Sequence, residues 1–119
     1  MIGLGSHLKI YLALEPCDMR KSYDGLGALA EAFAPGRLKE GALFVFTNRR
    51  RNRFKALYYD RSGVCVLAKR LELGTFSWPS PSEHGGGSTM KLTPEALGPL
   101  FDGVQLRGAS MRPWYDAGD

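Results

Sequence analysis

The chain has 119 residues, a net charge of +4, an apolar share of 44% and a charged share of 24%, which is the composition of a single globular domain. No apolar run approaches the roughly 20 residues of a membrane span, and the N-terminus lacks the pattern of a secretory signal. We therefore expect a cytoplasmic protein that does not bind membranes.

The first part of the chain predicts a strand followed by a helix. Lys9–Leu14 is rich in β-forming residues, and Pro16 ends this run. Apolar residues then recur at helical spacing, so we expect a helix over Asp18–Ala34 that packs on a sheet. Asp18 is a residue type that favours the N-cap, and the Pro35-Gly36 pair would end the helix.

A β-hairpin is predicted next. Ala42–Thr47 is apolar on both faces and predicts a buried strand. Asn48–Arg53 has the composition of a polar turn, and Lys55–Tyr59 predicts the returning strand. This pairing places the arginines of the turn at the tip of the hairpin.

The segment after this hairpin is ambiguous. Behind a turn at 60–63, residues 64–72 fit both a helix face and a strand, and we favour the strand because β-branched residues and a turn come first. Thr75–Trp78 predicts a last short strand. Residues 79–91 are rich in Pro, Gly and Ser and predict a flexible loop.

The C-terminal part predicts a second helix. Thr93 is suited to the N-cap and Pro94 to the first helical position, and Gly103 would end the helix. Val104–Leu106 predicts an edge strand, and residues 107–119 predict a loosely ordered tail.

The order of these elements predicts an α+β fold. We expect one small domain over residues 1–106, in which an antiparallel β-meander carries an N-terminal helix and a C-terminal helix packed on it.

Basic residues concentrate in the middle of the chain. Between Asn48 and Arg70 eight cations accompany a single acid, a net charge of +7, which leaves −3 for the rest of the chain. DNA binds such a cluster through counterion release, and arginine adds forked donors for phosphate or guanine. A solvated basic loop and a docking site for a protein partner are the alternatives.

Two features lie outside the hairpin tip. Aromatic residues on strands are usually core, but Trp78 precedes a proline at a strand end and is the one most expected to be exposed, where a ring can stack on a base. Arg20 and Lys21 follow the expected helix start, where positive charge is unfavourable; this indicates either a binding site or cations neutralised by neighbouring acids. The candidate nucleic-acid-binding residues are Arg20, Lys21, Arg49, Arg50, Arg51, Arg53, Lys55, Lys69, Arg70 and Trp78.

The sequence offers little support for catalysis. Metal-dependent phosphoryl transfer uses clustered carboxylates, whereas Asp18, Asp60 and Glu72 are scattered. The two cysteines and two histidines lack zinc-ligand spacing, and neither a phosphate-binding loop nor a Ser-His-Asp arrangement is recognisable. We therefore expect reduced cysteines, no catalytic residues, no metal and no cofactor.

The segment that begins at Asp18 carries a resemblance to a known family. Asp18–Leu26, DMRKSYDGL, resembles the DMRKxxDGL signature of TnpB, the small accessory protein of IS66-type insertion sequences. Further landmarks of that family follow in the same order along residues 1–106: Met1-Ile2, Leu43–Phe46, Lys55–Asp60, Lys69–Glu72, Gly74–Pro79 and Leu92–Pro94. This chain departs from the family in a longer, glycine-rich stretch at 79–90 and in Cys17, where the family has a small or hydroxyl residue.

The resemblance implies a companion of a separate DDE-type transposase that is needed for efficient transposition, with DNA binding as the usual presumption. The expected partners are DNA at the element ends, the transposase and other proteins of the same element. An adaptor that binds the transposase and has little DNA contact is the alternative. Neither the DNA site nor the oligomeric state follows from the sequence.

Overall fold

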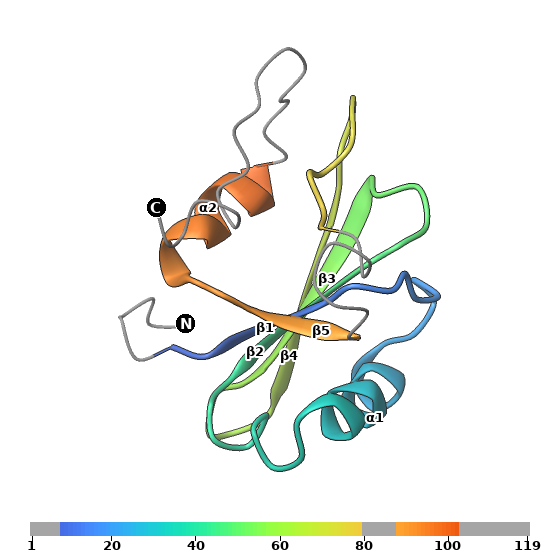
Figure 1. Ribbon diagram of the computed structural model, residues 1–119. Helices are drawn as coiled ribbons and strands as arrows, with labels where there is room; N and C mark the ends of the chain where they lie inside the picture. Colours follow the sequence, from blue (N-terminus) through green and yellow to red (C-terminus); the bar gives the residue numbers. More distant parts are fainter. Residues whose placement is uncertain (1–7, 80–87, 103–119) are drawn as a thin grey trace.

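The computed structural model describes residues 8–79 and 88–102, which form a five-stranded sheet and two helices (Figure 1). In chain order the elements are β1 (Ile10–Ala13), α1 (Tyr23–Phe33), β2 (Leu43–Thr47), β3 (Arg53–Tyr59), β4 (Val64–Arg70), β5 (Thr89–Leu92) and α2 (Pro94–Asp102). The strand order in the sheet is β4-β3-β2-β1-β5. The fold is the small α+β domain expected from the sequence.

The sheet is mixed because of the way β1 and β2 pair. β2, β3 and β4 form the expected antiparallel meander, in which Leu57 lies between Phe44 and Val66. β1 pairs parallel with β2, since α1 crosses back to the end of the sheet at which β1 begins. β5 pairs antiparallel with β1 at the other edge. The expectation of an all-antiparallel sheet is therefore corrected at the β1–β2 pair.

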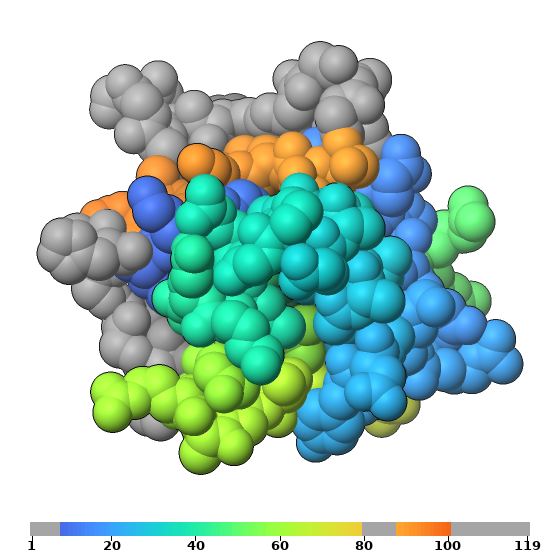
Figure 2. Space-filling model, turned by 90° about the horizontal axis from the view of Figure 1, so that it is seen from below, coloured from blue at the N-terminus to red at the C-terminus, as the bar shows by residue number. Residues whose placement is uncertain are grey.

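Each face of the sheet is covered by a different helix. The α1 face buries Ala13, Phe44, Phe46 and Leu57 together with Leu26 and Ala30 of the helix. The opposite face buries Ile10, Leu12, Val45, Phe54 and Ala56 together with Leu97 and Leu100 of α2 and with Phe76 and Trp78. In Figure 2 the helix α1 and the loop after it (blue to teal) lie between β5 (orange) and the β3–β4 turn (yellow-green).

The helix α1 begins at Tyr23, five residues later than expected. Asp18 is not its N-cap: the Asp18 carboxylate accepts hydrogen bonds from the backbone N–H of Arg20 (2.9 Å) and from the Arg20 guanidinium (2.7 Å at the shortest). Aspartate often bonds a backbone N–H two residues on, and this local turn competes with helix capping. Ser22 occupies the N-cap position without a side-chain cap.

Thr75–Trp78 is not the short strand that the sequence predicted. This segment crosses the α2 face of the sheet and is held by side chains and single hydrogen bonds instead of a strand ladder. The Phe76 N–H donates to the carbonyl of Arg51 (2.7 Å), and the Trp78 indole Nε1–H donates to the carbonyl of Ala13 (2.8 Å). Trp78 is only 7% exposed, so the expectation that it is the exposed aromatic is wrong.

The ambiguous segment after the hairpin is a strand, β4, as the favoured reading had it. β5 was not expected: residues 89–91, which were assigned to the predicted loop at 79–91, form most of this strand. α2 begins at Pro94 as predicted. The expected edge strand Val104–Leu106 and the tail at 107–119 lie outside the described residues. In the described part of the chain no helix is long and apolar enough to cross a membrane.

Candidate nucleic-acid interface

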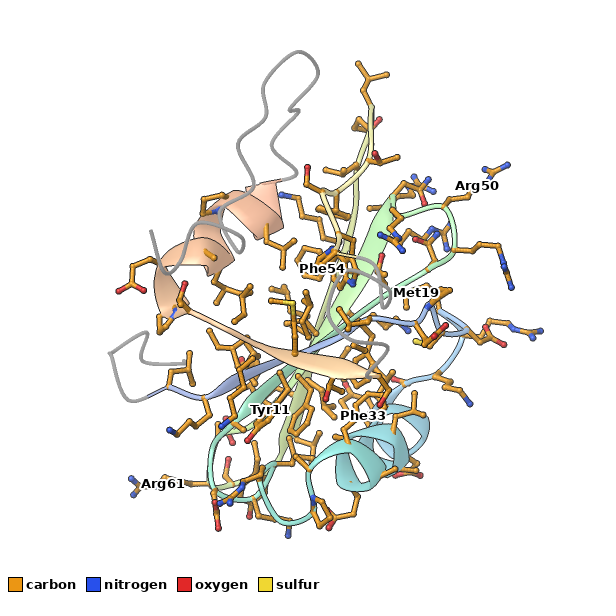
Figure 3. The ribbon with its side chains drawn as sticks, viewed as in Figure 1. Tyr11, Met19, Phe33, Arg50, Phe54 and Arg61 are labelled. Carbon is orange, nitrogen blue, oxygen red and sulfur yellow. The ribbon has the colours of Figure 1, made fainter. Side chains whose placement is uncertain are left out.

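The β2–β3 turn that carries the arginines is held by two asparagines. Asn48 Oδ1 accepts from the backbone N–H of Asn52 and of Arg53 (both 3.1 Å), and Asn48 Nδ2 donates to Asn52 Oδ1 (2.7 Å). This role was not predicted, although asparagines on both sides of an arginine run are the signal for it. Arg49 and Arg50 lie at the tip of the turn with exposed side chains, and Arg50 points into solvent (Figure 3).

Arg51 is the member of the turn that is built into the fold. Its backbone adopts a left-handed conformation (φ 62°), and its side chain is half-buried. Its Nη1 donates to the carbonyl of Trp78 (2.7 Å), while its own carbonyl accepts from Phe76. Arg51 therefore fastens the segment after β4 to the turn and presents less of its charge to solvent than its neighbours do.

The segment before α1 lies against the same end of the hairpin. The Cys17 N–H donates to the carbonyl of Thr47 (2.8 Å), and Lys55 Nζ donates to the carbonyl of Lys21 (2.7 Å). Burial at this junction raises the pKa of the Cys17 thiol. Two stretches that are more than 25 residues apart in the sequence, the DMRK motif and the arginine turn, are thus neighbours.

Arg20 and Lys21 differ in how much charge they offer. The Arg20 guanidinium forms a short ion pair with Asp18 (2.7 Å), and its hydrogen bonds lower the pKa of the Asp18 carboxyl to about 2. Asp18 is consequently ionised at neutral pH and neutralises Arg20. Lys21 is exposed and has no carboxylate partner among the described residues.

Two arginines lie directly opposite each other where β3 begins and β4 ends. The strand register pairs Arg53 with Arg70, and both side chains are exposed. No carboxylate of the described residues forms a salt bridge with either arginine. Like charges facing across a strand pair destabilise it, so this position favours a bound anion.

An open groove of about 400 Å³ lies beside this arginine pair. Its lining consists of Met19, Arg53, Phe54, Lys55, Ala68, Lys69 and Arg70. Met19, which was not among the candidate residues, brings the segment before α1 to the groove. Figure 3 shows Met19 at the same end of the sheet as Arg50. The groove therefore combines cations from both strands with an apolar wall.

The structure gathers nine cations at one end of the sheet, which we call the basic end: Arg20, Lys21, Arg49, Arg50, Arg51, Arg53, Lys55, Lys69 and Arg70. Arg61, the remaining cation of the basic segment, lies in the β3–β4 turn at the opposite end (Figure 3). Trp78 is corrected as a binding residue, because its ring is buried on the α2 face and cannot stack on a base. The other nine candidate residues are brought together.

The acids of the described residues do not converge with these cations into a metal site. Asp60 lies at the far end of β3, where hydrogen bonds from Ser62 and Gly63 lower the pKa of its carboxyl. Asp18 lies at the basic end. Within residues 8–79 and 88–102 no three His, Cys, Asp or Glu side chains are grouped so that they could hold a metal ion.

Comparison with known proteins identifies the family. The sequence profile described as "IS66 Orf2 like protein" matches residues 8–111, which is most of the chain. The chain belongs to the IS66 Orf2-like family. Two similar proteins of Sinorhizobium fredii carry the names "Uncharacterized protein y4hO" and "Uncharacterized protein y4jC". They are 29% identical over 107 residues (90% of each chain) and 32% identical over 113 residues (95% of this chain, 93% of the relative).

No solved structure matches this IS66 Orf2-like protein significantly. Membership in the family gives a role in the biology of an insertion sequence, as an accessory to transposition.

Proposed function

We propose that this IS66 Orf2-like protein is a non-catalytic accessory protein that binds the DNA of its insertion sequence through the basic end and assists the separate transposase there. The observation that carries the proposal is the cross-strand pair of Arg53 and Arg70, which face each other beside an open groove without a carboxylate among the described residues. Because bacterial DNA is cytoplasmic, the proposal places the protein in the cytoplasm.

A DNA phosphate is suited to this arginine pair. Guanidinium groups present forked donors that match phosphate oxygens, and a phosphodiester between Arg53 and Arg70 would relieve their repulsion. Arg49 and Arg50 at the tip of the turn, and Lys69 on the rim of the groove, then add contacts along the backbone. Such contacts set the position of the protein on DNA and carry no sequence information by themselves.

An adaptor that binds the transposase is the second candidate, and β4 is the feature that favours it. In the described residues β4 is an edge of the sheet, with Val64 exposed by 36% and Leu67 by 49%. An edge strand can accept an extended segment of another protein as an added strand. Val64 and Leu67 do not line the groove, which β4 reaches only with Ala68, Lys69 and Arg70, so a single protein can serve both roles.

The proposal is tested by comparing two variants: one lacks the arginine pair, and the other lacks two cations elsewhere on the surface. The variant R53S/R70S removes two cations from the groove, and R61N/K39Q removes two cations from the opposite end of the molecule. Asparagine suits the left-handed backbone of Arg61 (φ 82°). Affinity for the terminal repeats of the element, measured by electrophoretic shift, should fall about tenfold or more in the first variant.

The control variant should bind almost as wild type does. Equal losses in the two variants would show that total charge matters and that the groove does not. If R53S/R70S folds, binds DNA and recruits the transposase as wild type does, the groove is not the DNA site and the adaptor at β4 is the function.

A further inference from the structure

A second cavity, of about 480 Å³, lies on the α1 face at the end of the sheet away from the arginine turn. Its lining consists of Lys9, Tyr11, Arg37, Glu40, Gly41, Ala42 and Lys91. The strand register places Lys91 beside Tyr11, and Arg37 comes from the loop between α1 and β2. Three cations from three separate parts of the chain thus converge on one pocket.

The described residues do not balance the charge of this pocket. Glu40 is its one lining carboxylate, and it already accepts a hydrogen bond from Arg37 Nη1 (2.7 Å). Neither Lys9 nor Lys91 forms a salt bridge within the described residues, although Lys91 Nζ lies 6.0 Å from the Tyr11 ring centre. The lining therefore carries a net charge of +2.

Tyr11 gives the pocket a rigid wall with a hydroxyl donor. Its ring stacks on Phe44 with centroids 5.0 Å apart and an interplanar angle of 16°. Phe44 is itself buried under α1, so the position of the Tyr11 ring is fixed by the core. Figure 3 shows Tyr11 on the α1 side of the sheet.

We propose that this pocket binds a phosphate monoester group. Such a group carries a charge of about −1.5 to −2 at neutral pH, which matches the lining, and it presents three oxygens to three cationic side chains. A carboxylate has half the charge and two oxygens, so it satisfies the pocket less completely.

The pocket is separate from the basic end. The helix α1 lies over the face between the two, and it contains no Lys or Arg and exposes Asp24 and Glu31. An acidic helix repels a polyanion that would lie across both places. The inference therefore stands on its own residues and does not depend on DNA binding in the groove.

The test uses the folded full chain and two probes, inorganic phosphate and a dinucleotide with and without a 5′-phosphate, each followed by amide chemical shifts. Signals of Lys9, Gly41 and Lys91 should move on addition of phosphate. K9Q/K91Q changes two exposed lysines and should weaken binding about tenfold. K39Q is the control. Lys39 lies on the same loop as Arg37 and Glu40, but its Nζ lies over the Tyr59 ring (4.9 Å from the ring centre) and it does not line the pocket.

The outcomes distinguish a free phosphate from the phosphorylated end of a nucleic acid, and they distinguish binding in this pocket from binding in the groove. Binding of inorganic phosphate as tight as that of the phosphorylated dinucleotide supports a free phosphate ligand. Binding of only the phosphorylated dinucleotide supports the end of a nucleic acid. R53S/R70S should leave either result unchanged. Absence of shifts at the pocket, or equal weakening by K39Q, overturns the inference, whatever happens to DNA binding in the groove.

Discussion

Arg51 shows how a residue in a cluster of like charge can serve the fold. Its neighbours Arg49 and Arg50 are exposed, whereas Arg51 turns back and donates to the carbonyl of Trp78 (2.7 Å). Its left-handed backbone allows the chain to reverse at this point. All three were expected to bind nucleic acid, and nothing local in a run of three arginines distinguishes the one that has a tertiary partner.

We predict that Arg51→Asn lowers the free energy of unfolding by about 1–2 kcal/mol, because the half-buried carbonyl of Trp78 loses its donor. Asparagine tolerates the left-handed conformation, so backbone strain does not add to the effect. Urea denaturation gives the measurement. Arg50→Asn, at the exposed tip, is the control and should change stability by less than about 0.5 kcal/mol. Equal effects of the two substitutions would refute the structural role of Arg51.

At the scale of elements, local patterns sufficed for the hairpin and for both helices. β2 and β3 are runs of β-forming residues joined by a short polar turn, so their pairing is a local event. The favoured reading of residues 64–72 as a strand was also correct, since it continues the same meander. These elements position the arginine turn, and the candidate site at the hairpin was therefore visible in the sequence.

The pairing of elements that are distant in the sequence was not predicted. β5 joins β1 across more than 75 residues, and its four residues have no stronger pattern than the loop before them. The parallel pairing of β1 with β2 did have a signal, since a helix between two strands is typical of a parallel crossover, but the expectation of an antiparallel meander did not take it into account. The predicted start of α1 at Asp18 was wrong, because the Asp18 carboxylate accepts a hydrogen bond from the backbone N–H of Arg20 in a local turn and does not cap the helix.

Trp78 is the clearest case of tertiary context overriding a local signal. Its position before Pro79 indicated an exposed ring, but its indole N–H reaches the Ala13 carbonyl 65 residues away. This contact ties the segment after β4 to β1 on the α2 face of the sheet.

We predict that Trp78→Phe lowers the free energy of unfolding by about 1–3 kcal/mol, because the buried Ala13 carbonyl loses its donor while most of the ring packing stays. Tyr23→Phe also removes a polar hydrogen from an aromatic side chain, but at a site that is 54% exposed. This control should change stability little. Thermal unfolding of both variants makes the comparison, and a Trp78→Phe variant as stable as wild type would contradict the assigned contact.

At the scale of the whole molecule, positive charge is concentrated at one end. Seven of the eight cations between Asn48 and Arg70 lie at the basic end, and the segment before α1 adds Arg20 and Lys21. In the groove between Met19 and the β3–β4 pair, neither Arg53 nor Arg70 forms a salt bridge with a carboxylate of the described residues. Such a distribution is suited to a protein that positions itself on a DNA backbone while its other surfaces remain available to the transposase.

The salt dependence of DNA binding by the wild-type protein tests this account most directly. Counterion release predicts that a plot of log affinity against log salt falls by about 0.9 per phosphate contacted on duplex DNA. One phosphate shared by Arg53 and Arg70, and one each at Arg49, Arg50 and Lys69, should therefore give a slope of about −3.6, which the R53S/R70S variant should flatten by about 0.9. A wild-type affinity that does not change with salt, or an absence of binding at low salt, would contradict the proposed function.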